Sequence, residues 1–435
     1  MTPSTSSSPA PALAPVSAWR ALFASPRELW LVFAAKYLEG VSLYSVLYTA
    51  TLWLSVDHGL GDVEAGVWFG AFGTLVALLT MVVGFVVDWL GVRRALVLAF
   101  AASAVARAVM TLATSATMAK FGLLALAVGT SAGVPVMNAA LRQYSTPATR
   151  PMSFAIYYAL LNLGAMTAAL SLDATRAAFP ALAYRALYAI GTACAVLAFV
   201  VALFLRVPPP SDEAEAPRDT APSRIARDVV REAAFWRFML LVALVAMVTL
   251  LYQHFHATWP KYVLRELGAS YPLGRVASLN SGSVLVLVPL VAWLTSRWRA
   301  LDAITVGTIV SVAGTFILCL GAYTSTLVAM VLVLSLGEAF WAPRFYAYAA
   351  SIAPRGREAT YMSLASLPMF LAKVVAGPVS GVLLARYCPE EGPRDSARMW
   401  LIIASTSAIG PVLLVVLRRV ITGGEPRRAS SSGGA

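Results

Sequence analysis

Two ionisable residues in an apolar segment near the N-terminus are the first candidates for chemistry in this sequence. Lys36 and Glu39 lie one helical turn apart, and on a helix Lys36 shares one face with three residues at successive intervals of four, Gly40, Tyr44 and Tyr48. Such a face could bind a polar solute. A charge inside a membrane span costs about 2.5–3.5 kcal/mol, so it should face protein or water.

Two interpretations of Lys36 stay open. In the first, Lys36 and Glu39 only neutralise each other, or the lysine extends to the membrane surface. In the second, Lys36 reaches into the space that Gly40 leaves and supplies a cation for a ligand.

A carboxylate and a proline occur together in the apolar segment 325–351. Glu338 precedes Pro343 by five residues, and a proline break beside a carboxylate is typical of a gating element. The alternative is a structural ion pair of Glu338 with Lys373 or Arg344.

His254 is a candidate proton site because the ordinary pKa of histidine, about 6.5, lets it titrate near neutral pH. The alternative is that it lies at a wet helix end near Trp259. Arg107 stands alone in its apolar segment, and we expect it to pack or to lie near a water-filled edge.

The composition restricts the class of protein. Of 435 residues, 59% are hydrophobic and only 12% are charged, whereas soluble domains carry about 25% charged residues. We therefore exclude a soluble enzyme and a nucleic-acid partner, and expect a non-enzymatic protein in contact with lipid. Cys194, Cys319 and Cys388 form neither a disulfide framework nor a metal-binding spacing, so no metal and no cofactor are expected.

Twelve apolar runs are long enough to cross a bilayer as helices. They cover residues 30–54, 64–88, 93–115, 119–141, 151–172, 184–206, 236–258, 276–296, 302–323, 325–351, 358–386 and 397–420. The sequence thus predicts an all-α membrane protein with twelve transmembrane helices in two six-helix bundles.

A polar segment after the sixth run divides the chain. The predicted domains are a tail 1–29, an N-terminal bundle 30–206, a linker 207–235, a C-terminal bundle 236–420 and a tail 421–435. Lys and Arg are about twice as frequent on the side of the termini, which places both termini in the cytoplasm. High Ala and Arg usage is typical of GC-rich bacteria and predicts the inner membrane.

The segment GFVVDWLGVRR between the second and third runs resembles the signature loop of the major facilitator superfamily. The matching residues are Gly84, Asp88, Gly91, Arg93 and Arg94. Glycine permits a tight turn, and an aspartate can cap a helix or pair with arginine. We expect these residues, with Pro343, to control the conformational change.

Further motifs resemble the proton-dependent oligopeptide transporter (POT) family. In the fourth run, the matching positions are Gly129, Thr130, Gly133, Pro135 and Gln143. The fifth run contains YYALLNLGA, the seventh YQH and the eighth SLN, and the tenth contains Gly-Glu followed by Pro.

The resemblance implies site residues at the matching positions Asn162, Gln253, Asn280 and Glu338, with Glu39 from the first run. It implies that Glu338 contacts a substrate amine. Glu39, Glu338 and His254 are the candidate proton-coupling residues because their side chains can titrate. Departures put peptide transport in doubt. In the family, the first run carries Glu-x-x-Glu-Arg. Here Lys36 stands in place of the first glutamate and Gly40 in place of the arginine, and Val134 stands in place of a lysine that the family has in the fourth run. The cations that bind a peptide carboxylate in the family are therefore altered in this chain.

We expect a secondary transporter that moves a small organic solute by alternating access around a wet crevice. An ion gradient would drive it, because no ATP-binding phosphate loop occurs, and protons are the expected coupling ion. The alternatives are proton-antiport efflux of drugs or metabolites, and a non-transporting sensor or scaffold. The resemblance implies a monomer.

Overall fold

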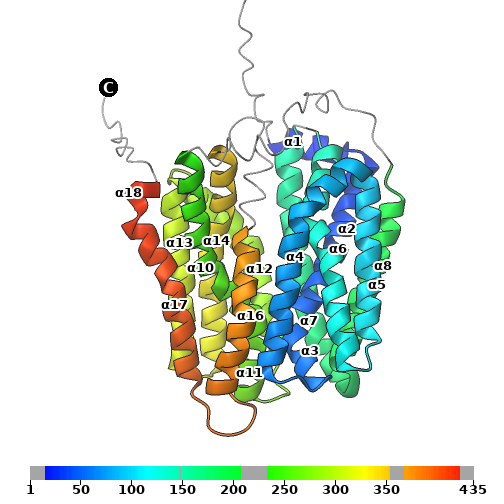
Figure 1. Ribbon diagram of the computed structural model, residues 1–435. Coiled ribbons are helices and arrows are strands. Elements are labelled where there is room, and N and C mark those ends of the chain that lie inside the picture. Colours follow the sequence, from blue (N-terminus) through cyan, green and yellow to red (C-terminus); the bar gives the residue numbers. More distant parts are fainter. Residues whose placement is uncertain (1–14, 147, 207–232, 353–366, 422–435) are drawn as a thin grey trace, which may run out of the picture. The chain divides into compact units, whose positions relative to one another are not determined.

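The chain is α-helical throughout the residues that the computed structural model describes, 15–146, 148–206, 233–352 and 367–421 (Figure 1). Lipid offers no hydrogen bonds to backbone groups, so a helix, which satisfies its own, is the stable form of each long apolar run. The described part contains twelve helices of 17 residues or more. The predicted all-α membrane architecture is confirmed.

By their mutual packing, the residues fall into two compact units. Unit 1 takes Met1–Val46 and Leu78–Pro210, and unit 2 takes Leu47–Ala77 and Ser211–Ala435. Residues 47–77 therefore group with unit 2, whereas the sequence assigned them to the first bundle. The predicted linker lies mostly within 207–232, outside the described residues, and the bundle boundaries stay predictions.

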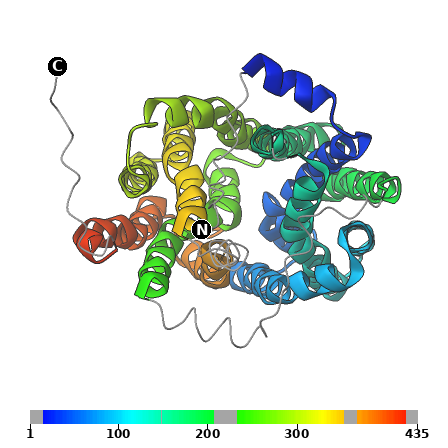
Figure 2. The ribbon, with the colours of Figure 1, turned by 90° about the horizontal axis from the view of Figure 1, so that it is seen from above.

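Unit 1 is built from long helices that Figure 2 shows nearly end-on. Its elements are α1 (Pro15–Phe23), α2 (Arg27–Leu47), the second part of α4 (Asp62–Leu90), α5 (Val92–Thr111), α6 (Ala116–Tyr144), α7 (Arg150–Ala178), η1 (Pro180–Leu182) and α8 (Ala183–Leu203). Helix α5 packs against α6 and α8. Phe33, Phe100 and Leu141 are buried in its core.

Unit 2 contains the remaining elements. They are α3 (Ala50–Val56), the first part of α4, α10 (Ala233–Ala257), α11 (Trp259–Leu267), α12 (Leu273–Leu294), α13 (Ala300–Phe316), η3 (Ile317–Leu320), α14 (Thr324–Ile352), α16 (Leu367–Tyr387), α17 (Ser396–Val416) and α18 (Arg418–Ile421). Helix α14 packs against α12 and α13, and Phe238, Trp341 and Phe345 lie in the core.

Ten of the described helices are long and apolar enough to cross a membrane. The other two predicted spans coincide with α2 and α16. Helix α2 carries Arg27, Glu28, Lys36 and Glu39, and its charges keep its hydropathy low. The eleventh predicted span begins in residues 358–366, outside the described part.

The first predicted span is two helices rather than one. Helix α2 ends at Leu47, Tyr48 and Thr49 form a turn, and α3 begins at Ala50. The expectation that Tyr48 continues the face of Lys36 and Tyr44 is therefore wrong, because helical periodicity stops before it.

Glycines bring α4 and α16 into backbone contact inside unit 2. A Cβ on Gly66 would lie 2.3 Å from the Gly377 carbonyl oxygen, and one on Gly377 would lie 2.4 Å from that of Gly66. Only hydrogen fits at such distances, and small residues are the usual means of close helix approach in membranes.

An ionic cluster joins the start of α4 to α11, also within unit 2. Lys261 Nζ donates to Asp62 Oδ1 over 2.8 Å. The Arg265 guanidinium binds both carboxylate oxygens, over 2.8 and 2.9 Å. Two cations thus compensate one largely buried carboxylate.

Replacing Gly377 with valine should destabilise the protein by about 1–3 kcal/mol or more, because the added methyl groups force the two backbones apart. The measurement is thermal unfolding of the purified protein in detergent. Gly61→Val is the control, since a Cβ there meets nothing within 4 Å. Equal melting temperatures for both variants would contradict the close contact.

Candidate functional site

In unit 1, Lys36 and Glu39 form a buried ion pair on α2. The Lys36 Nζ atom donates to Glu39 Oε2 over 2.8 Å, and only 2% of the lysine side chain is exposed. The same nitrogen lies 4.6 Å from the centroid of the Tyr157 ring on α7. The lysine therefore does not extend to the membrane surface; it is held by a carboxylate and an aromatic face.

The predicted space beside Gly40 is already filled. A Cβ on Gly40 would lie 3.1 Å from the Leu161 carbonyl oxygen, and one on Gly164 would lie 2.8 Å from the Tyr37 carbonyl oxygen. Gly40 serves close packing of α2 on α7. The hypothesis that Lys36 reaches into a void at Gly40 is wrong for this reason.

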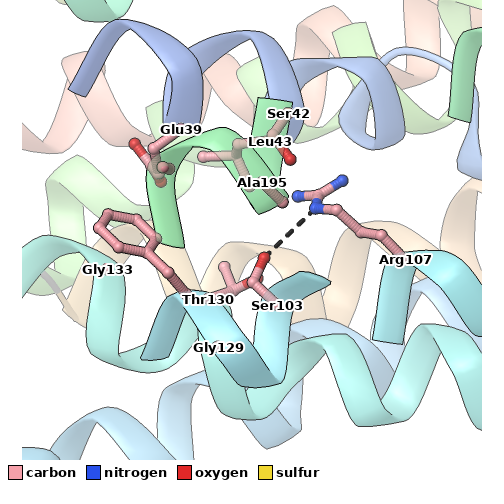
Figure 3. Close-up of a pocket in the computed structure, with 11 residues that line it drawn as sticks. Glu39, Ser42, Leu43, Ser103, Arg107, Gly129, Thr130, Gly133 and Ala195 are labelled. Carbon is pink, nitrogen blue, oxygen red and sulfur yellow. Dashed lines mark hydrogen bonds between the residues drawn. The ribbon is translucent and has the colours of Figure 1, made fainter. Parts of the chain in front are cut away.

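A small cavity lies within unit 1 among α2, α5, α6 and α8 (Figure 3). Glu39 faces it from α2, and Arg107 faces it from α5. Arg107 is buried, and its Nε atom donates to Ser103 Oγ over 3.3 Å. The sequence predicts that Arg107 packs or lies near a water-filled edge, and its place in the wall of a small cavity is compatible with this.

In unit 2, Asn280 and Glu338 come together from α12 and α14. The Asn280 Nδ2 atom donates to Glu338 Oε2 over 3.3 Å and to Ser335 Oγ over 3.0 Å. Glu338 has no ion pair with any residue in the described ranges.

The cations suggested as ion-pair partners of Glu338 have other neighbours. The Arg344 guanidinium donates to the Thr295 carbonyl oxygen over 2.8 Å. The Lys373 Nζ atom lies 5.9 Å from the Phe72 ring centroid. Pro343 lies inside α14, which continues to Ile352, so the expected interruption of the helix at this proline is not observed.

His254 on α10 is buried rather than at a wet helix end. Its Nδ1 atom lies 2.7 Å from Thr258 Oγ1, which in turn donates to Ser380 Oγ over 2.8 Å. Thr258 thus links the imidazole of His254 to Ser380. Gln253 is also buried, and its Oε1 atom has no hydrogen-bond partner among the described residues.

The other predicted ligand residues lie in different surroundings. Tyr44 is partly exposed on α2. The Tyr48 ring centroid is 5.6 Å from that of His256 in unit 2. The Asn162 Nδ2 atom donates to the Tyr158 carbonyl oxygen over 3.0 Å, so this amide is engaged by its own helix.

The predicted conformational motif covers the end of α4, the turn at Gly91 and the start of α5. Gly91 has φ +76°, which favours glycine and explains its place in the motif. Arg93 donates to the Leu203 carbonyl oxygen over 3.0 Å, and Arg94 is exposed. The side chain of Asp88 and the surroundings of Gly84 lie outside what the structure describes of α4.

Sequence reasoning missed two contacts of the site, the ring of Tyr157 and the hydroxyl of Ser335. Tyr157 begins the YYALLNLGA segment, so its position in that motif was an available signal. Ser335 precedes Glu338 by three residues and shares its helix face, a spacing that was also visible.

A family model described as Major Facilitator Superfamily matches residues 32–377. No curated protein matches the chain.

Solved structures of transporters share the fold. A peptide transporter POT in complex with sulfate is 18% identical, with a TM-score of 0.72 over 91% of this chain and 95% of that chain. The nucleoside transporter NupG is 13% identical, with a TM-score of 0.76 over 90% and 100%. A POT family transporter in complex with 5-aminolevulinic acid is 14% identical, with a TM-score of 0.74 over 91% and 97%. The predicted major facilitator fold is confirmed.

Breaking the buried pair on α2 should cost stability. Lys36→Met leaves Glu39 without its cation and should lower the free energy of unfolding by about 3–5 kcal/mol. The double variant Lys36→Met/Glu39→Gln removes both charges and should recover much of the loss, as measured by thermal unfolding.

The control is Asp302→Asn, which breaks the more exposed pair with Arg418 and should cost at most about 1 kcal/mol. Losses that simply add in the double variant would mean that the two charges of α2 are not coupled.

Proposed function

Because the chain belongs to the major facilitator superfamily, we propose that it is a secondary transporter in which protons drive movement of a small organic solute. The family is one of membrane transporters, and transport of a solute is its general activity. Proton coupling and the chemical class of the solute are the specific parts of the proposal.

The observation that carries proton coupling is the environment of Glu338. This carboxylate lies in a transmembrane helix and accepts a hydrogen bond from the Asn280 amide, with no cation paired to it among the described residues. An uncompensated charge is costly at this depth. Proton uptake removes the charge, so the proton affinity of Glu338 depends on whether water or a solute reaches it.

Glu39 supports a different role. Its charge is compensated by Lys36 at 2.8 Å. We assign proton binding first to Glu338, and we place Glu39, Lys36 and Tyr157 in a polar group that holds solute or shapes its path. His254, hydrogen-bonded to Thr258 and enclosed, is the second proton candidate.

The chemical class of the solute is inferred from the POT-family site residues that this chain retains and from those that it replaces. Glu338 and Asn280 remain, and a carboxylate with an amide suits a solute that carries an amino group. The cations for a peptide carboxylate are changed at Gly40 and Val134. We therefore propose an amine-bearing organic solute other than an ordinary dipeptide.

Antiport remains the main alternative to symport, and the direction of the gradient distinguishes them. Purified protein is first tested by thermal shift against dialanine, 5-aminolevulinic acid, uridine and organic cations. The stabilising compound is then followed in proteoliposomes. Symport predicts accumulation when the outside is acidic; antiport predicts it when the lumen is acidic.

Glu338→Gln should reduce gradient-driven accumulation at least about tenfold, because glutamine cannot bind and release the proton. Solute counterflow, which needs no net proton movement, should fall less than gradient-driven accumulation, because glutamine keeps a hydrogen-bonding oxygen for the solute. The control is Glu64→Gln, at an exposed glutamate of the same unit. Gradient-driven accumulation by Glu338→Gln at the wild-type rate would refute Glu338 as the coupling site.

A further inference from the structure

The cavity inside unit 1 contains a buried cation with unused hydrogen-bond donors. Arg107 is 4% exposed. Its guanidinium points into the cavity (Figure 3), and of its five N–H groups only that of Nε has an acceptor among the described residues, Ser103 Oγ. The four N–H groups of the two terminal nitrogens are therefore available.

Two hydroxyl groups line the same cavity as further donors. Ser103 accepts from Arg107, and its own proton has no acceptor in the described part of the chain. Thr130, on α6, likewise forms no hydrogen bond with a described residue. The Ser42 hydroxyl, by contrast, already donates to the Gly191 carbonyl oxygen over 2.8 Å.

The charges around the cavity do not balance. Arginine stays protonated in proteins, and the Lys36 ammonium is buried nearby on α2, so two cations face one carboxylate. Glu39 lines the cavity but forms its ion pair with Lys36 and, among the described residues, none with Arg107. An excess of one positive charge remains, and a buried charge without a counter-charge is strongly unfavourable.

The size of the cavity limits what can supply the missing charge. About 20 Å³ is open to the centres of water molecules, and one water needs about 10–15 Å³. The space accepts one or two waters or one compact ion, and a drug-sized solute does not fit.

We propose that this cavity is a binding site for one small monovalent anion of about the size of chloride, held by the Arg107 guanidinium and the Ser103 and Thr130 hydroxyls. The anion completes the charge balance that Lys36 and Glu39 leave open. Its place is the end of the cavity next to Arg107, where the donors converge and the Glu39 carboxylate, already neutralised, repels it least.

The site is separate from the proposed proton site in unit 2, so the two proposals can fail independently. Anion binding needs neither a transported solute nor a proton gradient and can be measured on purified protein at equilibrium.

The experiment is a thermal-unfolding titration at constant ionic strength. Protein purified in sodium gluconate, whose anion is too large for the cavity, is titrated with sodium chloride, sodium bromide or sodium sulfate. We expect the two halides to raise the melting temperature along a saturable curve, and sulfate to have no saturable effect. Crystals soaked in bromide should show an anomalous peak beside the Arg107 guanidinium.

Variants test the donors one by one. Arg107→Gln should abolish the halide effect, and Arg107→Lys should keep it with an affinity about tenfold lower, because an ammonium offers fewer, less directed donors. Ser103→Ala should also weaken binding about tenfold. The control is Arg185→Gln, which removes a part-buried arginine that donates to the Ala113 carbonyl oxygen, away from the cavity.

Several outcomes would overturn the proposal. Sulfate and gluconate stabilising as much as chloride would indicate a general salt effect, and an Arg185→Gln variant that loses the halide response as Arg107→Gln does would mean the same. A water in place of the bromide peak would show a hydrated arginine without an anion. If Arg107→Gln does not fold, the titration of Ser103→Ala and the bromide map decide the question.

Discussion

The cost of placing a charge among apolar helices governs how this molecule is built. Water cannot reach most of these positions, so each ionisable group inside a span needs a partner from the chain or from outside it. Asp62 has two cations, and Lys36 has a carboxylate and an aromatic ring. These groups are satisfied by the fold and hold helices in register. Arg107 and Glu338 have a hydrogen-bond partner but no ion pair in the described part of the chain, and these are the positions at which we propose that an anion and a proton bind.

Glycine contacts make these enclosed pairs possible. The approach of Gly40 to α7 brings the Tyr157 ring within reach of Lys36, and the approach of Gly66 to Gly377 leaves no room for lipid between α4 and α16. Backbone contact and charge placement therefore depend on each other. A side chain at either glycine would open a path along which lipid or water could reach the buried groups.

Much of the fold follows from the sequence because hydrophobic length alone selects the helices, and each of the twelve predicted spans overlaps one helix of 17 residues or more in the described structure. The turn at Tyr48 and Thr49 was not predictable in this way, since apolar residues continue through it. The partners of ionisable residues were harder still. The spacing of Lys36 and Glu39 predicts that they form an ion pair. Hydropathy does not indicate which helix supplies the ring of Tyr157. Glu338 accepts a hydrogen bond from Asn280 and does not pair with Arg344 or Lys373. This selection depends on three-dimensional packing.

The grouping of residues 47–77 with unit 2 has a consequence for synthesis. Asp62 and Lys261 are separated by 199 residues, and at a translation rate of 5–20 residues per second about 10–40 s pass between them. During this time α3 and the first part of α4 lie in the bilayer before α11 and α16, the helices that they contact in the folded protein, have been synthesised. Asp62 stands at the first residue of α4, where headgroup water can solvate it until its cations emerge from the ribosome. The placement of this carboxylate at a helix terminus thus protects a nascent chain in which α3 and the start of α4 are made early but find their neighbours late.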